Sequence, residues 1–279
     1  MTLIPSERKN PRGRYSVLAL AAATLVAISG GASAHEYWIE PLDFRIEAGD
    51  TASAELKVGQ HFKGASRSYL PGRFFAFDVA NGSETTPVEG RIGARPAIQD
   101  MALAPGLNIV TQETRPEKLT WKTLAEFEAF VAMHGLEQLV ARHRDRGLKE
   151  GGFVERYRRN AKALVQVGDE PGSDRRVGMA YELVAEANPY ALDGDVLPVR
   201  LYWDGAPEAG AQLHVFRKSD GEDFSRVVTD ADGRANIPVE PGETYMVNAV
   251  HMVEREGRAE EDHAVWESYW SSLTFAVPE

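Results

Sequence analysis

Residues 196–217, VLPVRLYWDGAPEAGAQLHVFR, contain two short segments in which apolar and polar side chains alternate. The segments are separated by Asp204-Gly205 and Pro207, which are typical of turns. Alternation with a period of two predicts half-buried strands, because successive side chains of a strand point to opposite faces of a sheet. This stretch therefore predicts two strands joined by a turn.

The same pattern extends in both directions from this stretch. Between Met179 and Val277 we expect about seven short strands, and between His35 and Val110 a further series, with turn residues between them. Short strands with frequent turns are typical of immunoglobulin-like sandwiches. We therefore predict a mainly β protein with two β-sandwich domains, residues 35–185 and residues 186–279.

The spacing of apolar residues changes from strand-like to helical between Thr120 and Val165, which predicts a helical insertion at about 120–165 in the first domain. Gly135 and Gly151-Gly152 divide it into three helices. Thr120 and Thr123 are both candidate N-terminal caps of the first helix. Two interpretations fit this insertion: it covers one face of the sandwich, or it is an arm that binds a partner. The helically spaced residues are Leu124, Phe127, Val131, Leu136, Leu139 and Val140, followed in the third helix by Phe153, Tyr157, Ala161 and Leu164.

The first 34 residues have the features of an export signal. A basic start, 8–14, precedes an apolar run, Val17 to Ile28, and the small residues Ala32-Ser-Ala34 form a cleavage pattern. The run is shorter than the ~20 apolar residues of a membrane span. We therefore expect a periplasmic or secreted protein that does not span the membrane after cleavage, with His35 as its first residue.

The composition excludes several classes of function. The chain has 279 residues, with 31 Lys and Arg against 42 Asp and Glu, for a formal net charge of −11. Loss of residues 1–34 removes four basic residues and one acidic residue, which leaves −14. Such an acidic chain is not expected to bind nucleic acid. It contains no cysteine, which excludes disulfides, thiolate metal sites and cysteine nucleophiles.

A processed His35 would be an unusual metal ligand. Its α-amine and its imidazole have ordinary pKa values of about 7.7–8.0 and about 6.5, so both lose their protons near neutral pH. Together they chelate one ion, and this nitrogen pair suits Ni²⁺, Co²⁺, Cu²⁺ and Zn²⁺ better than Mg²⁺ or Ca²⁺. The alternative is an exposed histidine at a frayed end of the chain.

Two further histidines are candidate metal ligands. His251 lies near the end of a patterned strand, and His61 lies where a strand runs into a loop, within reach of the mature N-terminus. A structural role is the alternative for both. His134 and His143, among Arg and Glu, fit a solvated helix face, and His214 fits a sheet face. Neither a G-x-S-x-G elbow, nor an H-E-x-x-H helix, nor a P-loop occurs, so we do not expect an enzyme.

The mature chain resembles a family of periplasmic nickel/cobalt-uptake components, long described as a domain of unknown function. The resemblance begins at His35-Glu-Tyr-Trp-Ile-Glu-Pro41 and covers essentially the whole mature chain. The other segments that carry it are Val58-Gly-Gln-His-Phe-Lys-Gly64, Tyr69-Leu-Pro71, Arg156-Tyr157 with Ala161-Lys-Ala163, Asn188-Pro-Tyr190, Thr229-Asp-Ala-Asp-Gly-Arg234, Val250-His-Met252 and Trp266 to Phe275.

This resemblance implies an extracytoplasmic protein with a transthyretin-like second domain that delivers nickel or cobalt to an inner-membrane transporter. It implies that His35 is a metal ligand, and His251 matches the family as well. Two other functions remain open: a cell-envelope adhesion or assembly module without metal, and a copper oxidoreductase in which His35 forms half of a two-histidine brace. Mutation of His35 separates the metal carrier from the adhesion module, and ascorbate-driven oxygen consumption with copper would favour the oxidoreductase.

Overall fold

The computed structural model describes residues 1–2, 35–256 and 263–279. The chain divides into two units, Met1–Gly31 and Ala32–Glu279, and the fold given below is that of the second unit. Nearly all of the predicted export signal lies outside the described residues. Within those residues, no helix is long and apolar enough to cross a membrane.

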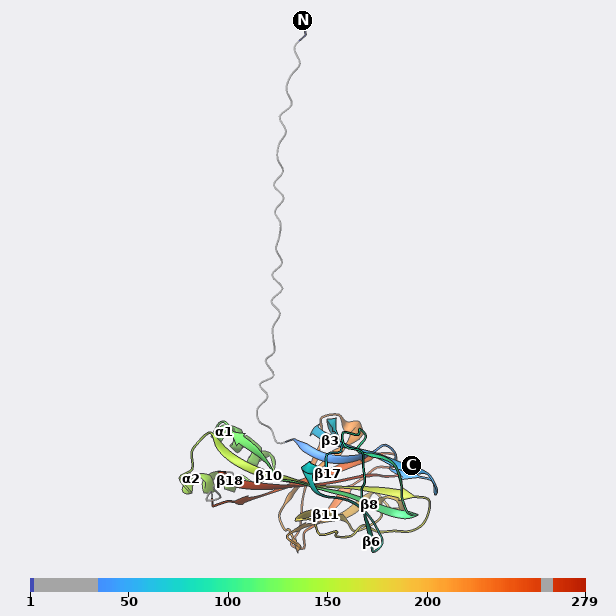
Figure 1. The fold of residues 1–279 in the computed structure, drawn as a ribbon. Helices are drawn as coiled ribbons and strands as arrows, with labels where there is room; N and C mark the ends of the chain where they lie inside the picture. Colours follow the sequence, from blue (N-terminus) through green and yellow to red (C-terminus); the bar gives the residue numbers. More distant parts are fainter. Residues whose placement is uncertain (3–34, 257–262) are drawn as a thin grey trace. The chain divides into compact units, whose positions relative to one another are not determined.

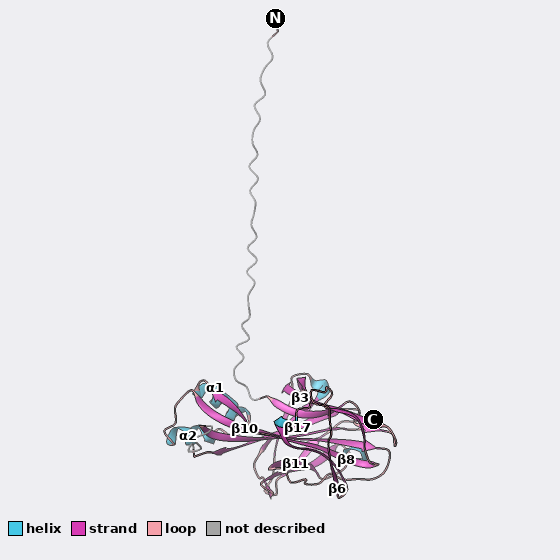
Figure 2. Ribbon diagram, in the orientation of Figure 1, coloured by secondary structure: helices cyan, strands magenta, loops and turns pink. Residues whose placement is uncertain are grey.

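Strands make up most of this unit, as Figure 2 shows, which confirms the predicted mainly β, sandwich-type fold. The α-helices are α1 (Leu124–Met133) and α2 (Gln138–Asp145), and three 3₁₀ turns are η1 (Pro71–Arg73), η2 (Pro189–Ala191) and η3 (Lys218–Asp220). The strands are β1 (Glu36–Pro41), β2 (Arg45–Ile46), β3 (Thr51–Gln60), β4 (Lys63–Arg67), β5 (Phe74–Asn81), β6 (Glu84–Pro87), β7 (Ile98–Ala102), β8 (Gly106–Thr114), β9 (Glu117–Trp121), β10 (Phe153–Val167), β11 (Tyr181–Ala185), β12 (Val196–Trp203), β13 (Ala206–Pro207), β14 (Gln212–Arg217), β15 (Ser225–Val228), β16 (Arg234–Pro238), β17 (Thr244–Glu254) and β18 (Ala264–Ala276).

The strands form three sheets. The largest has ten strands, in the order β15-β14-β17-β18-β10-β8-β5-β6, with β2 and β9 also paired to β10. The long strands β10 and β18 pair in parallel at its centre. Two smaller sheets have the orders β1-β3-β4, with β7 on β3, and β11-β12-β13, with β16 on β12.

The two smaller sheets cover opposite faces of the ten-stranded sheet. In β10, Ala161, Ala163 and Val165 pack against the β1-β3-β4 sheet, whereas Leu164 packs against the β11-β12-β13 sheet. Because neighbouring side chains in a strand point to opposite faces, these contacts place one small sheet on each side. Figure 1 shows the same layers, with β3 on one side of the long strands and β11 on the other.

The helices α1 and α2 cover the ends of β10 and β18 that carry Phe153 and Trp266, on the same face as the β1-β3-β4 sheet. Phe127 and Val131 are fully buried against Trp266 and its neighbours. Thr123, and not Thr120, caps α1, because its hydroxyl accepts a hydrogen bond from the backbone N–H of Glu126 at 3.2 Å. The helices therefore form a cover, which agrees with one of the two interpretations of the insertion.

The third predicted helix is wrong. Residues 153–167 form β10, the strand that pairs in parallel with β18. Most of its second half is buried on both faces, so its apolar residues do not alternate with polar ones. The helical spacing of four apolar residues was therefore coincidental, and pairing with residues more than 100 positions away decided the structure.

The predicted domain boundary near residue 185 falls between β11 and η2. Strands from both sides of this position nevertheless share the ten-stranded sheet, because β10 pairs directly with β18. β11 likewise pairs with β12 across the boundary. The two predicted parts are thus joined by backbone hydrogen bonds as well as by side-chain packing.

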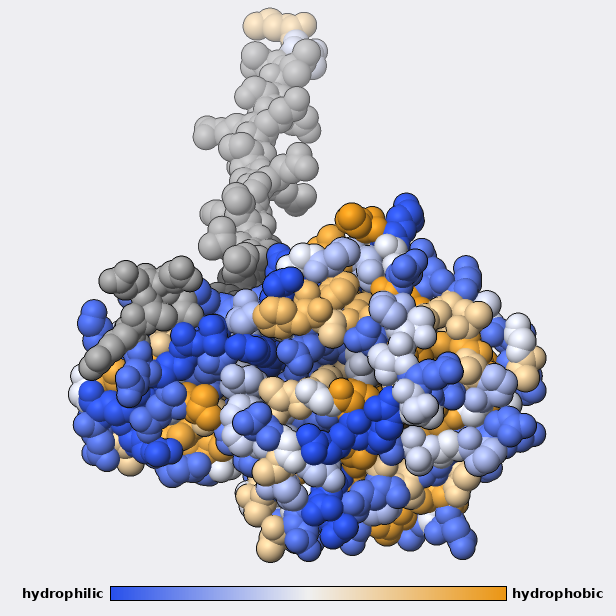
Figure 3. Space-filling model, turned by 60° about the horizontal axis from the view of Figure 1, so that its bottom comes forward, coloured by the Kyte–Doolittle hydropathy of each residue, from blue (hydrophilic) through white to orange (hydrophobic). Residues whose placement is uncertain are grey.

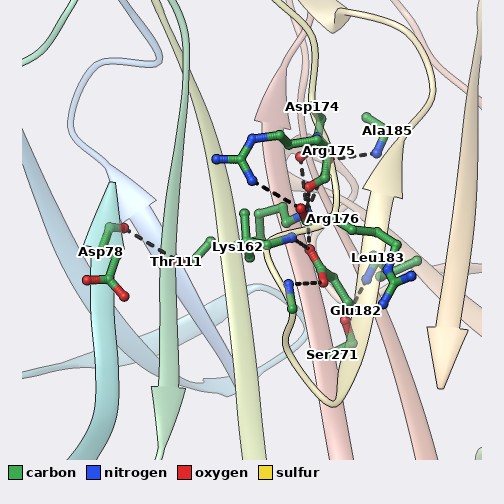
Figure 4. Close-up of polar contacts among 12 residues, drawn as sticks. Asp78, Thr111, Lys162, Asp174, Arg175, Arg176, Glu182, Leu183, Ala185 and Ser271 are labelled. Atoms are coloured by element: carbon green, nitrogen blue, oxygen red, sulfur yellow. Dashed lines mark hydrogen bonds and ion pairs between the residues drawn. The ribbon is translucent and has the colours of Figure 1, made fainter. Parts of the chain in front are cut away.

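A fully buried ionic cluster fixes the segment between β10 and β11 (Figure 4). The ammonium Nζ of Lys162 lies 3.0 Å from Asp174 Oδ1 and 2.9 Å from Glu182 Oε1, and all three side chains have no exposed surface. Lys162 also donates to the carbonyl of Arg175 at 3.1 Å. Three acceptors surround one ammonium, which is the arrangement that satisfies a buried charged lysine.

Candidate functional site

The first candidate ligand, His35, lies immediately before β1 and is partly buried. Its carbonyl accepts a hydrogen bond from Arg159 at 3.3 Å, whereas its ring Nδ1 is buried and has no hydrogen-bond partner among the described residues. Burial, together with the charges of Arg159 and Arg67, lowers the pKa of this ring. His35 is therefore neutral at neutral pH, which is the form that binds metals.

His61 lies at the tip of the β3–β4 hairpin. It and Phe62 are the two loop residues between paired Gln60 and Lys63, and their φ angles are 53° and 57°. Such a turn usually contains glycine or asparagine, and each bulky residue at positive φ costs about 1–2 kcal/mol. Phe62 offsets part of this cost by packing against Trp38, with ring centroids 5.4 Å apart. Residues held in strained backbone positions often have a functional role.

Glu36, which sequence analysis missed, lies beside His61. Its carboxylate accepts a backbone hydrogen bond from His61, and burial raises its pKa to about 7 despite that bond. Both Glu36 Oε2 and His61 Nδ1 are buried and have no hydrogen-bond partner in the described part of the chain. Together with His35 Nδ1, three ligand-type atoms without partners therefore lie at one end of the β1-β3-β4 sheet.

The structure places His251 apart from the other two predicted ligands. Its Nδ1 lies 2.8 Å from Glu208 Oε1, and its ring stacks on Trp203 at 4.1 Å. Trp203 belongs to β12, whereas Met246, five residues earlier in β17, packs with Trp38 of β1. His251 therefore lies on the face of the large sheet that β12 covers, opposite to the face that β1 covers. Across the described residues, no three His, Asp or Glu side chains are arranged to hold one metal ion.

His134 and His214 form a buried pair, which sequence analysis did not predict. Their rings stack with centroids 4.8 Å apart, and they are 5% and 2% exposed. Burial lowers the pKa of His134 well below its ordinary value and that of His214 to about 4. His143 is also fully buried, and its ring Nδ1 accepts a hydrogen bond from the indole N–H of Trp266 at 3.1 Å. The prediction of a solvated helix face for His134 and His143 is therefore wrong.

A pocket of about 200 Å³ lies between the β1-β3-β4 sheet and strands β5, β8 and β10. Because Tyr37 lines it and Glu36 is the preceding residue of the same strand, the pocket and the Glu36–His61 contact lie on opposite faces of β1. The charged and amide residues in its wall are Arg67, Arg73, Arg95, Gln112, Glu117 and Arg159. Sequence analysis missed this arginine pocket.

The face of the molecule drawn in Figure 3 is a mixture of hydrophilic and hydrophobic residues. Among the described residues on that face, hydrophobic groups are separated by hydrophilic ones. Broad apolar patches are what mark many protein interfaces. This face therefore gives no support to the alternative of an adhesion module.

These features define a β-sandwich-type protein with a histidine at the start of its first strand and an arginine-lined pocket beside it. The chain belongs to the DUF4198 family, described as a domain of unknown function, whose model matches residues 32–253. The predicted family resemblance is confirmed to that extent.

No curated protein matches the chain significantly. Among solved structures, it is similar to one titled "Biofilm associated protein - BSP domain", with 13% identity and a TM-score of 0.20. That match covers 86% of this chain and 30% of the other, so this chain spans less than a third of that protein's length.

Proposed function

We propose that the processed chain is a periplasmic or secreted binding protein for a divalent transition metal, Ni²⁺ or Co²⁺, and serves metal uptake. Its site begins at His35. Glu36 and His61 lie at the same end of the β1-β3-β4 sheet but are not arranged with His35 around one ion, so both would have to move to complete the site. The observation that supports this proposal is the group of three ligand-type atoms, His35 Nδ1, Glu36 Oε2 and His61 Nδ1. All three are buried and have no hydrogen-bond partner among the described residues. Buried polar atoms without partners are rare and call for an explanation.

The chemistry of these residues suits a transition metal. The α-amine and ring of His35 would chelate the ion once cleavage frees the amine, and imidazole with amine favours Ni²⁺, Co²⁺, Cu²⁺ and Zn²⁺. Glu36, whose pKa burial raises to about 7, would lose its proton when a cation binds beside it. Arg67 and Arg159 near His35 repel a free cation, so the affinity must come from the chelate. The protein would bind the ion and transfer it to a membrane transporter without converting it chemically.

The proposal predicts that metal binding depends on a free amine at His35. We expect stoichiometric binding of Ni²⁺ or Co²⁺ to the chain that begins at His35, measured by isothermal titration at pH 7.5. A chain that retains Ala34 lacks the primary amine of His35 and should bind at least tenfold more weakly, since each lost ligand removes a substantial part of the affinity. Affinity should also fall as the pH drops below about 7.7–8.0, where the α-amine takes up a proton and no longer binds the ion.

Two variants refine this measurement. Glu36→Gln should weaken binding about tenfold or more, because a neutral amide is a poorer ligand than a carboxylate. His251→Gln is the matched control and should bind normally, because His251 lies on the other face of the large sheet. Equal binding by the chains with and without Ala34, or no binding by either, would contradict the proposal.

A further inference from the structure

The arginine pocket contains hydrogen-bond donors that no described residue uses. Gln112 is 2% exposed, and its Oε1 accepts a hydrogen bond from the Tyr37 hydroxyl, which fixes the orientation of the amide. Its Nε2 is therefore a donor, and both this atom and Arg159 Nε are buried without a hydrogen-bond partner in the described residues. Both residues line the pocket. Leaving such donors unpaired costs free energy, so they indicate a ligand that accepts hydrogen bonds.

The pocket is also strongly basic within an acidic protein. Four arginines line it, and Glu117 is its one carboxylate. Burial opposes ionisation of Glu117, but hydrogen bonds from Tyr157 and Arg73 and the charge of Arg159 lower its pKa overall. Glu117 thus remains charged and neutralises one arginine, while the whole chain carries −11. A local excess of positive charge in a recess attracts anions.

The rest of the wall contains the apolar residues Leu56, Val58, Leu70 and Phe74, together with Tyr37, Ser68 and Thr114. A hydrocarbon surface contributes to affinity only if the ligand covers it with apolar atoms of its own. A volume of about 200 Å³ is below the roughly 300–1,000 Å³ of pockets for drug-sized molecules. The occupant must therefore be small, anionic and partly hydrocarbon.

We propose that this pocket binds a small organic acid with two or more carboxylates. Its carboxylates accept hydrogen bonds from the Gln112 amide and the arginine guanidiniums, which match carboxylates in two-pronged geometry. Its carbon chain lies against Leu56 and Phe74. Inorganic phosphate would satisfy the donors but leave this apolar wall without a partner. This site is distinct from Glu36 and His61, which lie on the other side of β1, whereas His35 lies near Arg67 and Arg159 of the pocket wall.

Isothermal titration and thermal unfolding with succinate, citrate and inorganic phosphate test this proposal. The protein begins at His35 and is kept in Tris buffer freed of metal ions by a chelating resin, so the result does not depend on metal binding. We expect succinate or citrate to bind and to raise the Tm, and phosphate to bind at least tenfold more weakly. Added salt should reduce the affinity, because charged contacts at a partly open site are screened.

Two variants locate the binding. Gln112→Glu keeps the acceptor for Tyr37 but replaces the amide donor with a negative charge, so carboxylate affinity should fall at least tenfold. Arg67→Gln, at an exposed side chain, should weaken binding severalfold without a risk of misfolding. Arg45→Gln, at an exposed arginine in β2 outside the pocket, is the matched control and should leave binding unchanged.

Three results would overturn the proposal. The first is no binding of succinate or citrate at millimolar concentration. The second is equal affinity for phosphate, which would indicate a simple inorganic anion site. The third is unchanged binding by Gln112→Glu and Arg67→Gln, which would place any carboxylate elsewhere on the protein.

Discussion

Replacement of Lys162 by methionine is expected to lower the free energy of unfolding by about 3–5 kcal/mol, the usual cost of breaking a buried ion pair from one side. Lys162 and its partners Asp174 and Glu182 have no exposed side-chain surface. Methionine fills a similar volume but carries no charge, so two carboxylates would remain in the core with their cation removed. Either they stay ionised at a high desolvation cost, or they take up protons and lose hydrogen bonds.

The damage should extend beyond one contact, because both carboxylates also organise the backbone. Asp174 accepts hydrogen bonds from the N–H groups of Arg175 at 2.7 Å and Ala185 at 2.8 Å. Glu182 accepts from Val177 at 2.7 Å and Gly178 at 3.0 Å. Figure 4 shows the Lys162 side chain reaching between the two carboxylates. The segment that connects β10 to β11 is therefore held by this cluster.

Urea unfolding, followed by circular dichroism, measures the effect. Lys218→Met is the matched control: Lys218 pairs with Glu40 at 2.6 Å but is half exposed, so we expect a change of about 0–1 kcal/mol. The triple variant Lys162→Met, Asp174→Asn, Glu182→Gln should recover part of the loss, because no uncompensated charge remains. A loss below about 1 kcal/mol for Lys162→Met would contradict the assigned role of the cluster.

Local patterns predicted those elements whose two faces differ. β12 was predicted by alternation, since one of its faces is buried more deeply than the other. β14 was predicted because the polar His214 stands between Leu213 and Val215, although both of its faces are buried. β10 was predicted as a helix because a strand buried on both faces has no alternation to detect. Its pairing partner β18 follows about 110 residues later, so no short window contains the deciding contacts.

The candidate site residues also divide into those that a local sequence pattern reveals and those that only the fold brings together. His35 could be predicted as a candidate because its position after the cleavage pattern is a local feature, and His61 because it follows a patterned strand. The arginine pocket could not, since Arg67 and Arg159 come together only when the β1-β3-β4 sheet packs on the large sheet, and the net charge of the chain has the opposite sign. The local sequence signal for this pocket was the pair Arg67 and Arg73, which flank Tyr69-Leu-Pro71. His134 was misassigned because its partner His214 lies 80 residues away.

The His134–His214 pair should make the protein sensitive to acid. In the folded chain, burial lowers the pKa of His214 to about 4, whereas an unfolded histidine has a pKa of about 6.5. Between these values the unfolded chain binds more protons, so stability is full above about pH 6.5 and is lost as the pH falls towards 4. His214 alone accounts for about 2 kcal/mol of loss at pH 5 and about 3 kcal/mol over the whole range. His134, whose pKa is also lowered by burial, adds to the effect.

Variants are needed to measure this effect, because carboxyls whose pKa values are raised by burial act in the opposite direction. Burial raises the pKa values of Glu36 and Glu155 to about 7, so both favour the folded state as the pH falls from 7 towards 4.5. Comparison of His214→Gln with the unaltered chain cancels their contribution. The stability advantage of the unaltered chain should shrink by about 2 kcal/mol between pH 7.5 and pH 5, measured by urea unfolding at each pH.

Phe216→Leu provides the matched control for this comparison, since Phe216 lies two residues from His214 on the same face of β14 and does not titrate. Its loss of stability should be the same at both pH values. A constant difference for His214→Gln as well would mean that the histidine accepts a proton in the folded state at its ordinary pKa. The ring would then have to reach water at pH 5, which its 2% exposure and its stacking on His134 oppose. The pH dependence of this one substitution therefore tests whether the packing of α1 against β14 persists in acid.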